Sequence, residues 1–254
     1  MRESRAGLWA FLVVAVLATA LFARLGAWQL ARLADRRAVS GQVAARMQLP
    51  PTGLDGSGRL EGVSADSLAW RRLRLRGTWD FEREVVIRGR ASRGTPGVHV
   101  VTPLRLGPRW GVLVLRGWLP AADGLSADLA GARPGQRGRD AEVEVEGLAL
   151  AGEARPRIPP RTLTFGSTEH LVLGALSIEQ ASGSLPYDLL PVFVLLTEPS
   201  GLAGAPSLVD EPIPSDGPHL WYAVQWFAFA LITLGGTAAY VRTRWRSTSS
   251  EGRA

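Results

Sequence analysis

The feature that most constrains this chain is an apolar segment near its C-terminus, residues 219–241. From Leu220 to Val241 it carries no charged side chain, and Gln225 is its only strongly polar residue. A segment of this length is sufficient for a helix that crosses the hydrocarbon core of a bilayer. Because lipid offers no hydrogen-bond partners to the backbone, such a segment is stable there only as a helix. The sequence therefore predicts a transmembrane helix over residues 219–241.

The orientation of this helix follows from the basic tail after it, residues 242–254, which begins with three closely spaced arginines. Basic flanks of membrane helices tend to stay in the cytoplasm. We therefore expect the tail to be cytoplasmic and His219 to lie at the outer end of the helix, beside Trp221 and Tyr222. Aromatic residues are typical of that boundary, and an ionisable side chain at a membrane helix end is a candidate functional residue.

A second apolar segment, residues 7–30, follows a short N-terminus, residues 1–6, that contains two arginines. Two interpretations remain open for it. It is either a retained first transmembrane helix, with Arg24 extending its guanidinium to the interface, or a signal peptide cleaved near Ala18. If both segments span, both termini are cytoplasmic and residues 31–218 lie outside. The protein would then be a multi-pass protein of the cell (inner) membrane with a periplasmic central domain.

Composition narrows the chemistry of the chain. All 29 basic residues are arginines, and the net charge is +6. They are spread along the chain between acidic residues, which disfavours a nucleic-acid interface. The chain has no cysteine, which excludes thiolate metal sites, disulfide exchange and covalent c-type haem attachment. With three histidines and two methionines, few metal sites with several protein ligands can be built.

The central region predicts a mostly antiparallel β domain, so the whole chain is expected to be a membrane α+β protein. Arginine alternates with leucine in residues 72–76, the period of a strand with one buried face. Further strands are expected at residues 84–88, 98–106, 111–115, 142–146 and 193–197. A helix is expected within residues 168–182, and loops at residues 52–62, 124–138 and 200–218, which are rich in glycine, proline or serine.

Two charged faces in this domain are of opposite sign. Arginines 72, 74 and 76 and glutamates 142, 144 and 146 each occupy alternate positions of an expected strand. Facing each other across a ladder, such pairs contribute a few tenths of a kcal/mol to about 1 kcal/mol each. The favoured interpretation is that each set faces solvent separately, because the pairing of these strands cannot be derived from the pattern.

Five stretches of the chain resemble, in order, the motifs of the Surfeit locus protein 1 family, the cytochrome c oxidase assembly factors. They are LGAWQLAR at 25–32, WRRLRLRGTWD at 70–80, GVHVVTPL at 97–104, RGWLP at 116–120 and HLWYAVQWF at 219–227. Together they frame nearly the whole chain. The resemblance implies two transmembrane helices around an external β domain and a role, without catalysis, in assembling a haem-copper terminal oxidase.

The resemblance also implies a cofactor and partners. Haem a would be held noncovalently with His219 as the iron ligand, and the expected partners are oxidase subunit I, haem a synthase and membrane lipid. The alternative is a haem-free scaffold that stabilises oxidase subunits through the RGW segment. The motif residues expected to serve as motif or partner contacts are Trp28, Gln29, Arg116, Gly117, Trp118 and Pro120.

The helical period predicts a surface for such a haem. At about 100° per residue, one stripe contains His219, Tyr222, Ala223, Trp226, Ala230 and Thr233. Its alanines would leave a shallow flat between the aromatic walls of Tyr222 and Trp226, against which a porphyrin could lie. Arg24 or Arg32 would pair with the haem propionates, because arginine binds carboxylates through two parallel hydrogen bonds. Without the resemblance, an interfacial histidine is the simpler interpretation of His219.

No sequence pattern of a catalytic site is present. The chain lacks a nucleophile elbow, a phosphate loop, a dinucleotide fingerprint and an H-E-x-x-H motif. His170 has Ser167 and Glu169 near it in sequence, but the members of a catalytic triad converge from different elements. His99 is interpreted as an ordinary sheet-surface histidine. The sequence therefore predicts no catalytic residue.

Overall fold

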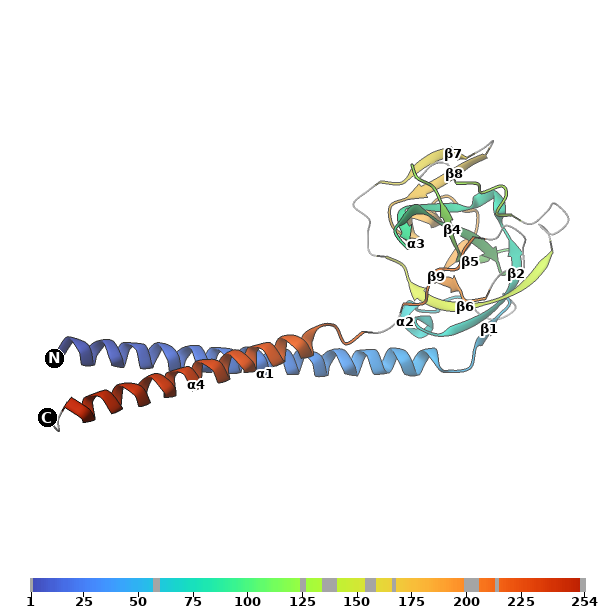
Figure 1. Ribbon diagram of the computed structural model, residues 1–254. Helices are drawn as coiled ribbons and strands as arrows, with labels where there is room; N and C mark the ends of the chain where they lie inside the picture. The colour runs from blue at the N-terminus through green and yellow to red at the C-terminus, as the bar shows by residue number, and fades with distance from the viewer. Residues whose placement is uncertain are drawn as a thin grey trace. The chain divides into compact units, whose positions relative to one another are not determined.

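A computed structural model describes residues 2–56, 60–123, 127–133, 141–153, 159–165, 168–198, 206–212 and 215–251. The chain forms two units: a helix unit of Met1–Val43 and Pro214–Ala254, and a β unit of Ala44–Ile213. Figure 1 shows their elements. In order, these are α1 (Arg2–Met47), β1 (Thr52–Leu54), α2 (Ala65–Leu68), β2 (Arg72–Trp79), η1 (Phe81–Arg83), β3 (Val85–Ser92), β4 (Thr95–Arg105), β5 (Trp110–Pro120), β6 (Glu142–Ala151), β7 (Arg161–Phe165), β8 (Thr168–Leu173), α3 (Ile178–Ser182), β9 (Asp188–Leu196) and α4 (His219–Glu251).

The helix unit pairs α1 with α4, and the two run antiparallel with the chain termini at the same end (Figure 1). Aromatic contacts follow the seam: the ring centroids are 5.0 Å apart for Phe11 and Tyr240, and 5.8 Å apart for Phe22 and Trp226. A Cβ added to Gly26 would lie 2.8 Å from the Phe227 ring. The missing side chain therefore lets the two helices approach closely, as small residues do in membrane helix pairs.

Both helices are long and apolar enough to cross a membrane, over Ala6–Met47 and His219–Arg246, which supports membrane association. The helix α1 continues beyond the predicted transmembrane segment at residues 7–30, as far as Met47. The apolar run ends earlier, but residues 31–47 are rich in alanine and arginine, which favour helix whether or not they are buried. Pro50 follows the end of the helix, where proline disfavours its continuation.

The β unit is built on a closed ring of strands. The sheet order is β1-β2-β6-β9-β5-β4-β3-β8-β7, and β2 also pairs with β4. That extra pairing closes β2, β6, β9, β5 and β4 into a barrel, while β3, β8 and β7 extend the sheet beyond β4. Most pairs are antiparallel, as predicted; β1–β2, β3–β8 and β5–β9 are parallel. Closure leaves the central strands without a free edge.

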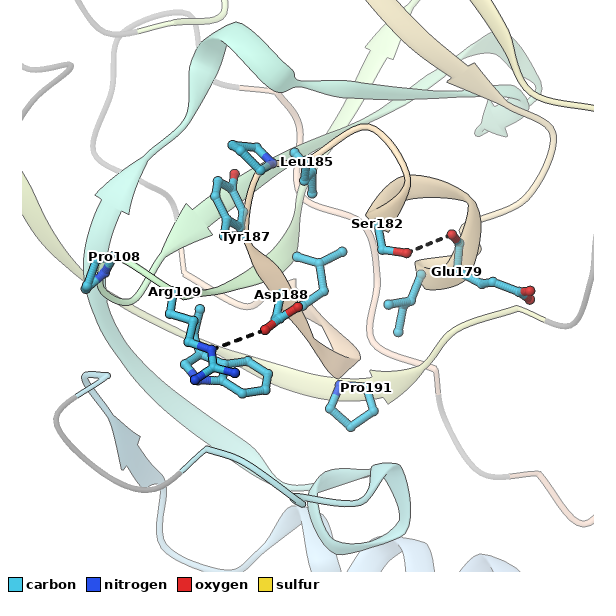
Figure 2. A pocket seen from close by; sticks show the side chains of 12 residues that line it. Pro108, Arg109, Glu179, Ser182, Leu185, Tyr187, Asp188 and Pro191 are labelled. Carbon is cyan, nitrogen blue, oxygen red and sulfur yellow. Dashed lines mark hydrogen bonds and ion pairs between the residues drawn. The ribbon is translucent and has the colours of Figure 1, made fainter.

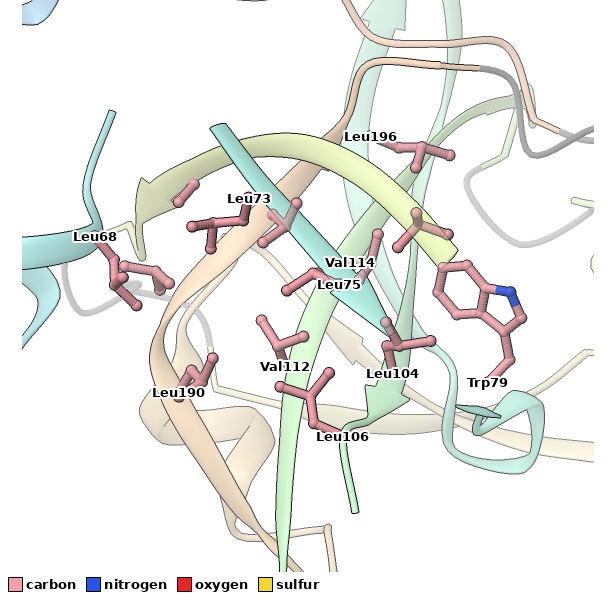
Figure 3. Packing of buried hydrophobic residues seen from close by; sticks show 14 of the residues in the cluster. Leu68, Leu73, Leu75, Trp79, Leu104, Leu106, Val112, Val114, Leu190 and Leu196 are labelled. Atoms are coloured by element: carbon pink, nitrogen blue, oxygen red, sulfur yellow. The ribbon is translucent and has the colours of Figure 1, made fainter. Parts of the chain in front are cut away.

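Leucine and valine side chains fill the barrel (Figure 3). Leu73 and Leu75 of β2 are fully buried in this cluster with Val112 and Val114 of β5. The alternation of leucine with arginine in β2 therefore has the predicted consequence: the leucines point inward and the arginines outward. A second cluster packs α3 against the outside of the sheet, with Ala181 fully buried there.

The outward arginines of β2 meet the glutamates of β6. Arg74 lies opposite Glu146 in the ladder. The ion pairs are Arg74–Glu144 at 3.5 Å, Arg74–Glu146 at 3.2 Å and Arg76–Glu142 at 3.0 Å. Arg72 instead pairs with Glu211 at 2.9 Å. The expectation of separate solvated faces is wrong about the pairing, although most of these side chains remain exposed and each pair contributes at most about 1 kcal/mol.

Some predicted elements are wrong. Residues 168–182 are not one helix: Thr168–Leu173 forms β8, and only Ile178–Ser182 is helical. The apolar residues of β8 are buried next to β3, and this tertiary pairing overrides a weak helical pattern. The expected loop at residues 52–62 contains the short strand β1, and β7 was not predicted at all.

A buried ion cluster lies between the barrel and the segment 127–133. Glu84 is fully buried; its Oε1 accepts from Nη1 of Arg116 at 2.9 Å, and its Oε2 accepts from Nε of Arg133 at 2.6 Å. The hydroxyl of Thr102 also donates to Oε1, at 2.8 Å. One carboxylate thus balances two guanidiniums in the interior, where an unpaired charge is very costly.

A β-bulge places Arg116 in this cluster. Val100 of β4 pairs with Gly117, but Val101 pairs with Leu115, so Arg116 is an extra residue in β5. A bulge changes the direction of a side chain relative to its neighbours. Arg116 is only 1% exposed, and its Cζ lies 5.2 Å from the Phe81 ring centroid. The bulge therefore directs a strand arginine to Glu84 instead of to solvent.

His170 belongs to the same cluster. Its Nδ1 lies 3.2 Å from the backbone oxygen of Glu84, and its Nε2 lies 3.2 Å from Nη2 of Arg133. The carbonyl requires a donor and the guanidinium an acceptor, so the ring is neutral with its proton on Nδ1. Burial is the main cause of its lowered pKa. His99 is partly buried rather than freely exposed, and burial and then Arg90 lower its pKa to about 4.

These two histidines predict acid sensitivity of the β unit. Their folded pKa values lie below the ordinary value of about 6.5, so the unfolded chain binds protons first as the pH falls. Stability should therefore be fully present above about pH 6.5 and fall toward pH 4, by at most about 1.4 kcal/mol per pH unit for each histidine. Urea unfolding of the full-length protein in detergent at several pH values checks this; a His99→Gln, His170→Gln double variant that shows the same slope would contradict it.

Candidate functional site

The candidate site is a hydrogen-bonded pair between the two helices of the helix unit. His219, the first residue of α4, places its Nδ1 2.9 Å from Oε1 of Gln29 on α1. An amide oxygen only accepts hydrogen bonds, so Nδ1 is the donor, and in the neutral imidazole the lone pair is then on Nε2. Metal-binding histidines are commonly fixed in this way by an acceptor on the second nitrogen. The pair therefore presents one defined nitrogen as a ligand.

The segment before α4 lies beside the Cδ2–Nε2 edge of this ring, at a residue that has no side chain. Gly217 has φ +69°, and a Cβ added to it would lie 3.4 Å from Cδ2 and 3.5 Å from Nε2 of His219. Next to it, Asp216 accepts a hydrogen bond of 2.9 Å from Nε of Arg37 on α1. Within the described part of the chain, His219 has no hydrogen-bond partner at Nε2. Glycine thus keeps side-chain atoms away from the nitrogen that a metal would use.

The predicted aromatic residues lie near this histidine on α4, one and two turns along the helix. Tyr222 is 48% exposed and is free to contact a ligand beside the helix. Trp226 is partly buried and stacks on Phe22 of α1 at an interplanar angle of 23°. Trp226 therefore contributes to helix packing as well as to the surroundings of His219.

The predicted flat for a porphyrin is not a free surface. Ala223 and Ala230 are 1% and 8% exposed, and they belong to the stripe of α4 that packs on α1. Small residues at this stripe allow close helix contact. A macrocycle cannot lie over them, so a haem ligated by His219 would have to approach from the Nε2 edge at the start of α4.

Helix geometry separates the two arginines expected to bind propionates. At 100° per residue, Arg24 lies about 140° around α1 from Gln29, whereas Arg32 lies about 60° away and about 4.5 Å farther along the axis. Arg24 lines a shallow pocket with Trp28 on α1. Arg32 is exposed. Of the two, Arg32 is the better placed for a propionate of a ligand at His219.

The RGWLP motif serves the interior of the β unit. Arg116 is 1% exposed and pairs with Glu84, so among the expected motif or partner contacts it makes an internal contact of the motif. A Cβ on Gly117, which has φ +152°, would lie 2.3 Å from the oxygen of Ser207. The Trp118 backbone exchanges hydrogen bonds of 2.7 and 3.0 Å with Ser207. The glycine thus allows the backbone at Ser207 to form hydrogen bonds with β5.

A second motif makes room for Trp118. A Cβ on Gly97, the first residue of the GVHVVTPL stretch, would lie 2.4 Å from Nε1 of Trp118 and 2.2 Å from the oxygen of Leu119. Pro120, at the end of β5, pairs with Gly97. Two stretches that are separate in sequence therefore describe one packing arrangement in β4 and β5. In the sequence, the signal for this packing arrangement is a glycine in one strand followed by a tryptophan in the next strand.

The β unit also contains an open cleft beside α3 and the starts of β5 and β9 (Figure 2). Arg109 and Asp188 face each other across it, with Nε and Oδ2 3.6 Å apart. The Tyr187 hydroxyl donates to Asp80 at 2.9 Å, and burial is the main cause of its raised pKa. Among the described residues, no group of three or more histidine, cysteine or acidic side chains could hold a metal. Ser167, near His170 in sequence, lies outside the described residues.

Together, the fold and the pair define a membrane-associated protein in which two apolar helices flank a β-barrel domain. The chain belongs to the SURF1 family, whose family model matches residues 16–231. It is 24% identical over 227 residues to a SURF1-like protein of Rickettsia felis, a match that covers 87% of this chain and 91% of that protein. Both Gln29 and His219 lie within the matched region. Membership of this family supports a general role in oxidase assembly.

Sequence reasoning did not find every residue of the site. Gln29 was expected only as a motif residue, and Gly217 was assigned to a loop. Each carried a signal: Gln29 is an uncharged polar residue at the outer end of an apolar helix, and Gly217 precedes the proline and histidine that begin α4. The sequence placed residues 24–29 and 219–226 at the same outer boundary, but it did not reveal the hydrogen bond between Gln29 and His219 or the position of Gly217 beside the same ring.

Proposed function

We propose that this protein is a noncatalytic assembly factor for a haem-copper terminal oxidase and carries haem a on His219. In this proposal it receives the haem from haem a synthase and delivers it to oxidase subunit I. The observation that supports it most is the Gln29–His219 hydrogen bond, which leaves Nε2 free. Haem iron is commonly ligated by one histidine, and the bound haem would supply the redox centre of the receiving oxidase.

The residues around His219 fit such a cargo. Nε2 of His219 has no hydrogen-bond partner among the described residues and could ligate iron, and Tyr222 offers an exposed aromatic face one turn farther along α4. Arg32 supplies a cation that suits a propionate. The chain's own residues would therefore bind and orient the haem, with no covalent attachment, because the chain contains no cysteine.

The proposed topology places both helices across the cell membrane and the β unit on the periplasmic side. Arginines 242, 244 and 246 follow the apolar part of α4, and such clusters favour the cytoplasm. Antiparallel pairing of α1 with α4 agrees with two crossings in opposite directions. A reporter protein fused into the β unit measures its side of the membrane and tests this arrangement.

A His219→Ala substitution is expected to abolish most haem binding, because it removes the iron ligand. The full-length protein would be purified in detergent from cells that synthesise haem a, and haem per polypeptide measured from the absorption spectrum. His99→Gln, which removes a histidine of the β unit, is the matched control and should retain the wild-type haem content.

The same measurement tests the haem-free scaffold. A wild-type protein without haem, or equal haem content in wild-type and His219→Ala proteins, would reject the carrier proposal and favour the scaffold. The scaffold has lost one of its expected contacts, because Arg116 is buried. Its remaining surface would have to be formed by other residues, such as Trp28, which is exposed on α1.

A further inference from the structure

We infer that Gln29 is the positioning residue of the haem site: it holds the Nδ1–H of His219 and thereby directs Nε2 to the iron. The inference rests on the proposed function, which assigns the ligand but not its orientation. Its basis is the 2.9 Å contact between Oε1 of Gln29 and Nδ1 of His219. The contact joins two helices whose paired residues are 190 positions apart in the chain.

The hydrogen bond decides which nitrogen is available. A neutral imidazole carries its proton on either nitrogen, and the partner of one nitrogen determines the role of the other. An acceptor at Nδ1 keeps the proton there, so that the lone pair is on Nε2. The same bond limits rotation of the ring, so the lone pair points in one direction.

No neighbouring residue of α1 can replace this acceptor. Over one turn on either side of Gln29, residues 25–33 read LGAWQLARL, in which Gln29 is the only side chain with a hydrogen-bond acceptor. Arg32 and Trp28 only donate hydrogen bonds. The ring orientation therefore depends on one amide oxygen and on the pairing of α1 with α4.

Gly217 completes the arrangement on the other side of the ring. A Cβ at this position would lie 3.4 Å from Cδ2 and 3.5 Å from Nε2, so a larger side chain would add atoms next to the nitrogen that is proposed to bind iron. The amide thus holds one edge of the imidazole, and the glycine places no side chain against the opposite edge.

Two substitutions of Gln29 test the inference in the full-length protein in detergent. Gln29→Leu removes the acceptor, and the affinity for added haem a should fall about 10-fold to 100-fold, the usual effect of losing such a partner. Gln29→Glu keeps an acceptor and makes it an anion, so haem should remain bound. The carboxylate draws the Nδ1 proton, so the iron–histidine stretching frequency in the ferrous resonance Raman spectrum should rise. Gln225→Leu, which also replaces a glutamine of the helix unit by leucine, is the matched control and should match the wild type.

The outcomes separate this inference from the proposed function. A wild-type protein that binds no haem a overturns both. Haem binding that depends on His219 but has the same affinity and the same iron–histidine frequency in Gln29→Leu overturns the positioning role alone. Loss of affinity in Gln29→Leu together with the frequency shift in Gln29→Glu supports it, because a merely structural role of Gln29 would not change the iron–histidine bond.

Discussion

Replacing Glu84 with alanine is expected to lower the free energy of unfolding of the β unit by about 3–5 kcal/mol, the usual cost of removing one partner from a buried ion pair. The substitution leaves Arg116 and Arg133 without their carboxylate, and their side chains are only 1% and 9% exposed. Urea unfolding of the full-length protein in detergent, followed by tryptophan fluorescence, measures the loss. Trp79 is a suitable probe, because its ring centroid lies 5.9 Å from Cζ of Arg116.

Glu142→Ala is the matched control for this prediction. It also removes a glutamate from an ion pair, but both partners, Glu142 and Arg76, are more than half exposed. Exposed pairs contribute about 0–1 kcal/mol, so this variant should remain close to the wild type. Equal losses in the two variants would show that burial of the Glu84 cluster does not determine its contribution.

Gly117→Ala is expected to lower the free energy of unfolding by about 2–4 kcal/mol, through lost hydrogen bonds and strain. The new Cβ would lie 2.3 Å from the oxygen of Ser207, so the returning chain must move away from β5. That movement breaks the two backbone hydrogen bonds between Trp118 and Ser207. The same urea titration measures the loss, and faster proteolysis near residue 207 should accompany it.

Gly107→Ala is the control that separates the effect of the steric clash at residue 117 from the effect of a positive φ angle. Gly107 has φ +159°, similar to the +152° of Gly117, but a Cβ there would meet nothing within 4 Å. Its substitution should therefore cost only the small conformational strain. If Gly107→Ala destabilised the protein as much as Gly117→Ala, the close approach of Ser207 would not be the reason for the glycine.

The elements predicted well were those whose side chains repeat with a clear period. The alternation of leucine and arginine in β2 indicated a strand with one buried face, and Leu73 and Leu75 are indeed fully buried. The two apolar helices were likewise evident, because long uncharged segments have few alternatives. Burial was thus predictable wherever the pattern itself separated apolar from charged residues.

Other features depend on contacts that a local pattern does not contain. Arg116 was expected only as a motif or partner contact; arginine is rarely fully buried, and the β-bulge that turns it inward appears only in the pairing of β4 with β5. The extension of α1 to Met47 was not predicted, because hydrophobicity indicates where a segment enters lipid but not where a helix ends. Residues 168–173 form a strand because β3 supplies its hydrogen bonds.

The candidate site was predicted in part for the same reason. His219 was found from its position at the end of an apolar helix. Its partner depends on the alignment of two helices far apart in sequence, so Gln29 was recognised only as part of a motif. The stripe that contains Ala223 lies on one face of α4, as expected. Because this face packs on α1, the flat surface expected for a porphyrin is buried.

The hydrogen bond between Gln29 and His219 also limits how α1 can slide along α4. The seam is otherwise apolar, with Phe227 packed against Gly26 and Phe22 stacked on Trp226, so the pair adds a polar contact to the packing that aligns the helices. A slip of one helical turn, about 5.4 Å, would move the amide out of reach of the imidazole and leave two polar groups unsatisfied. Like a single asparagine in the core of a coiled coil, the pair specifies one register of the two helices.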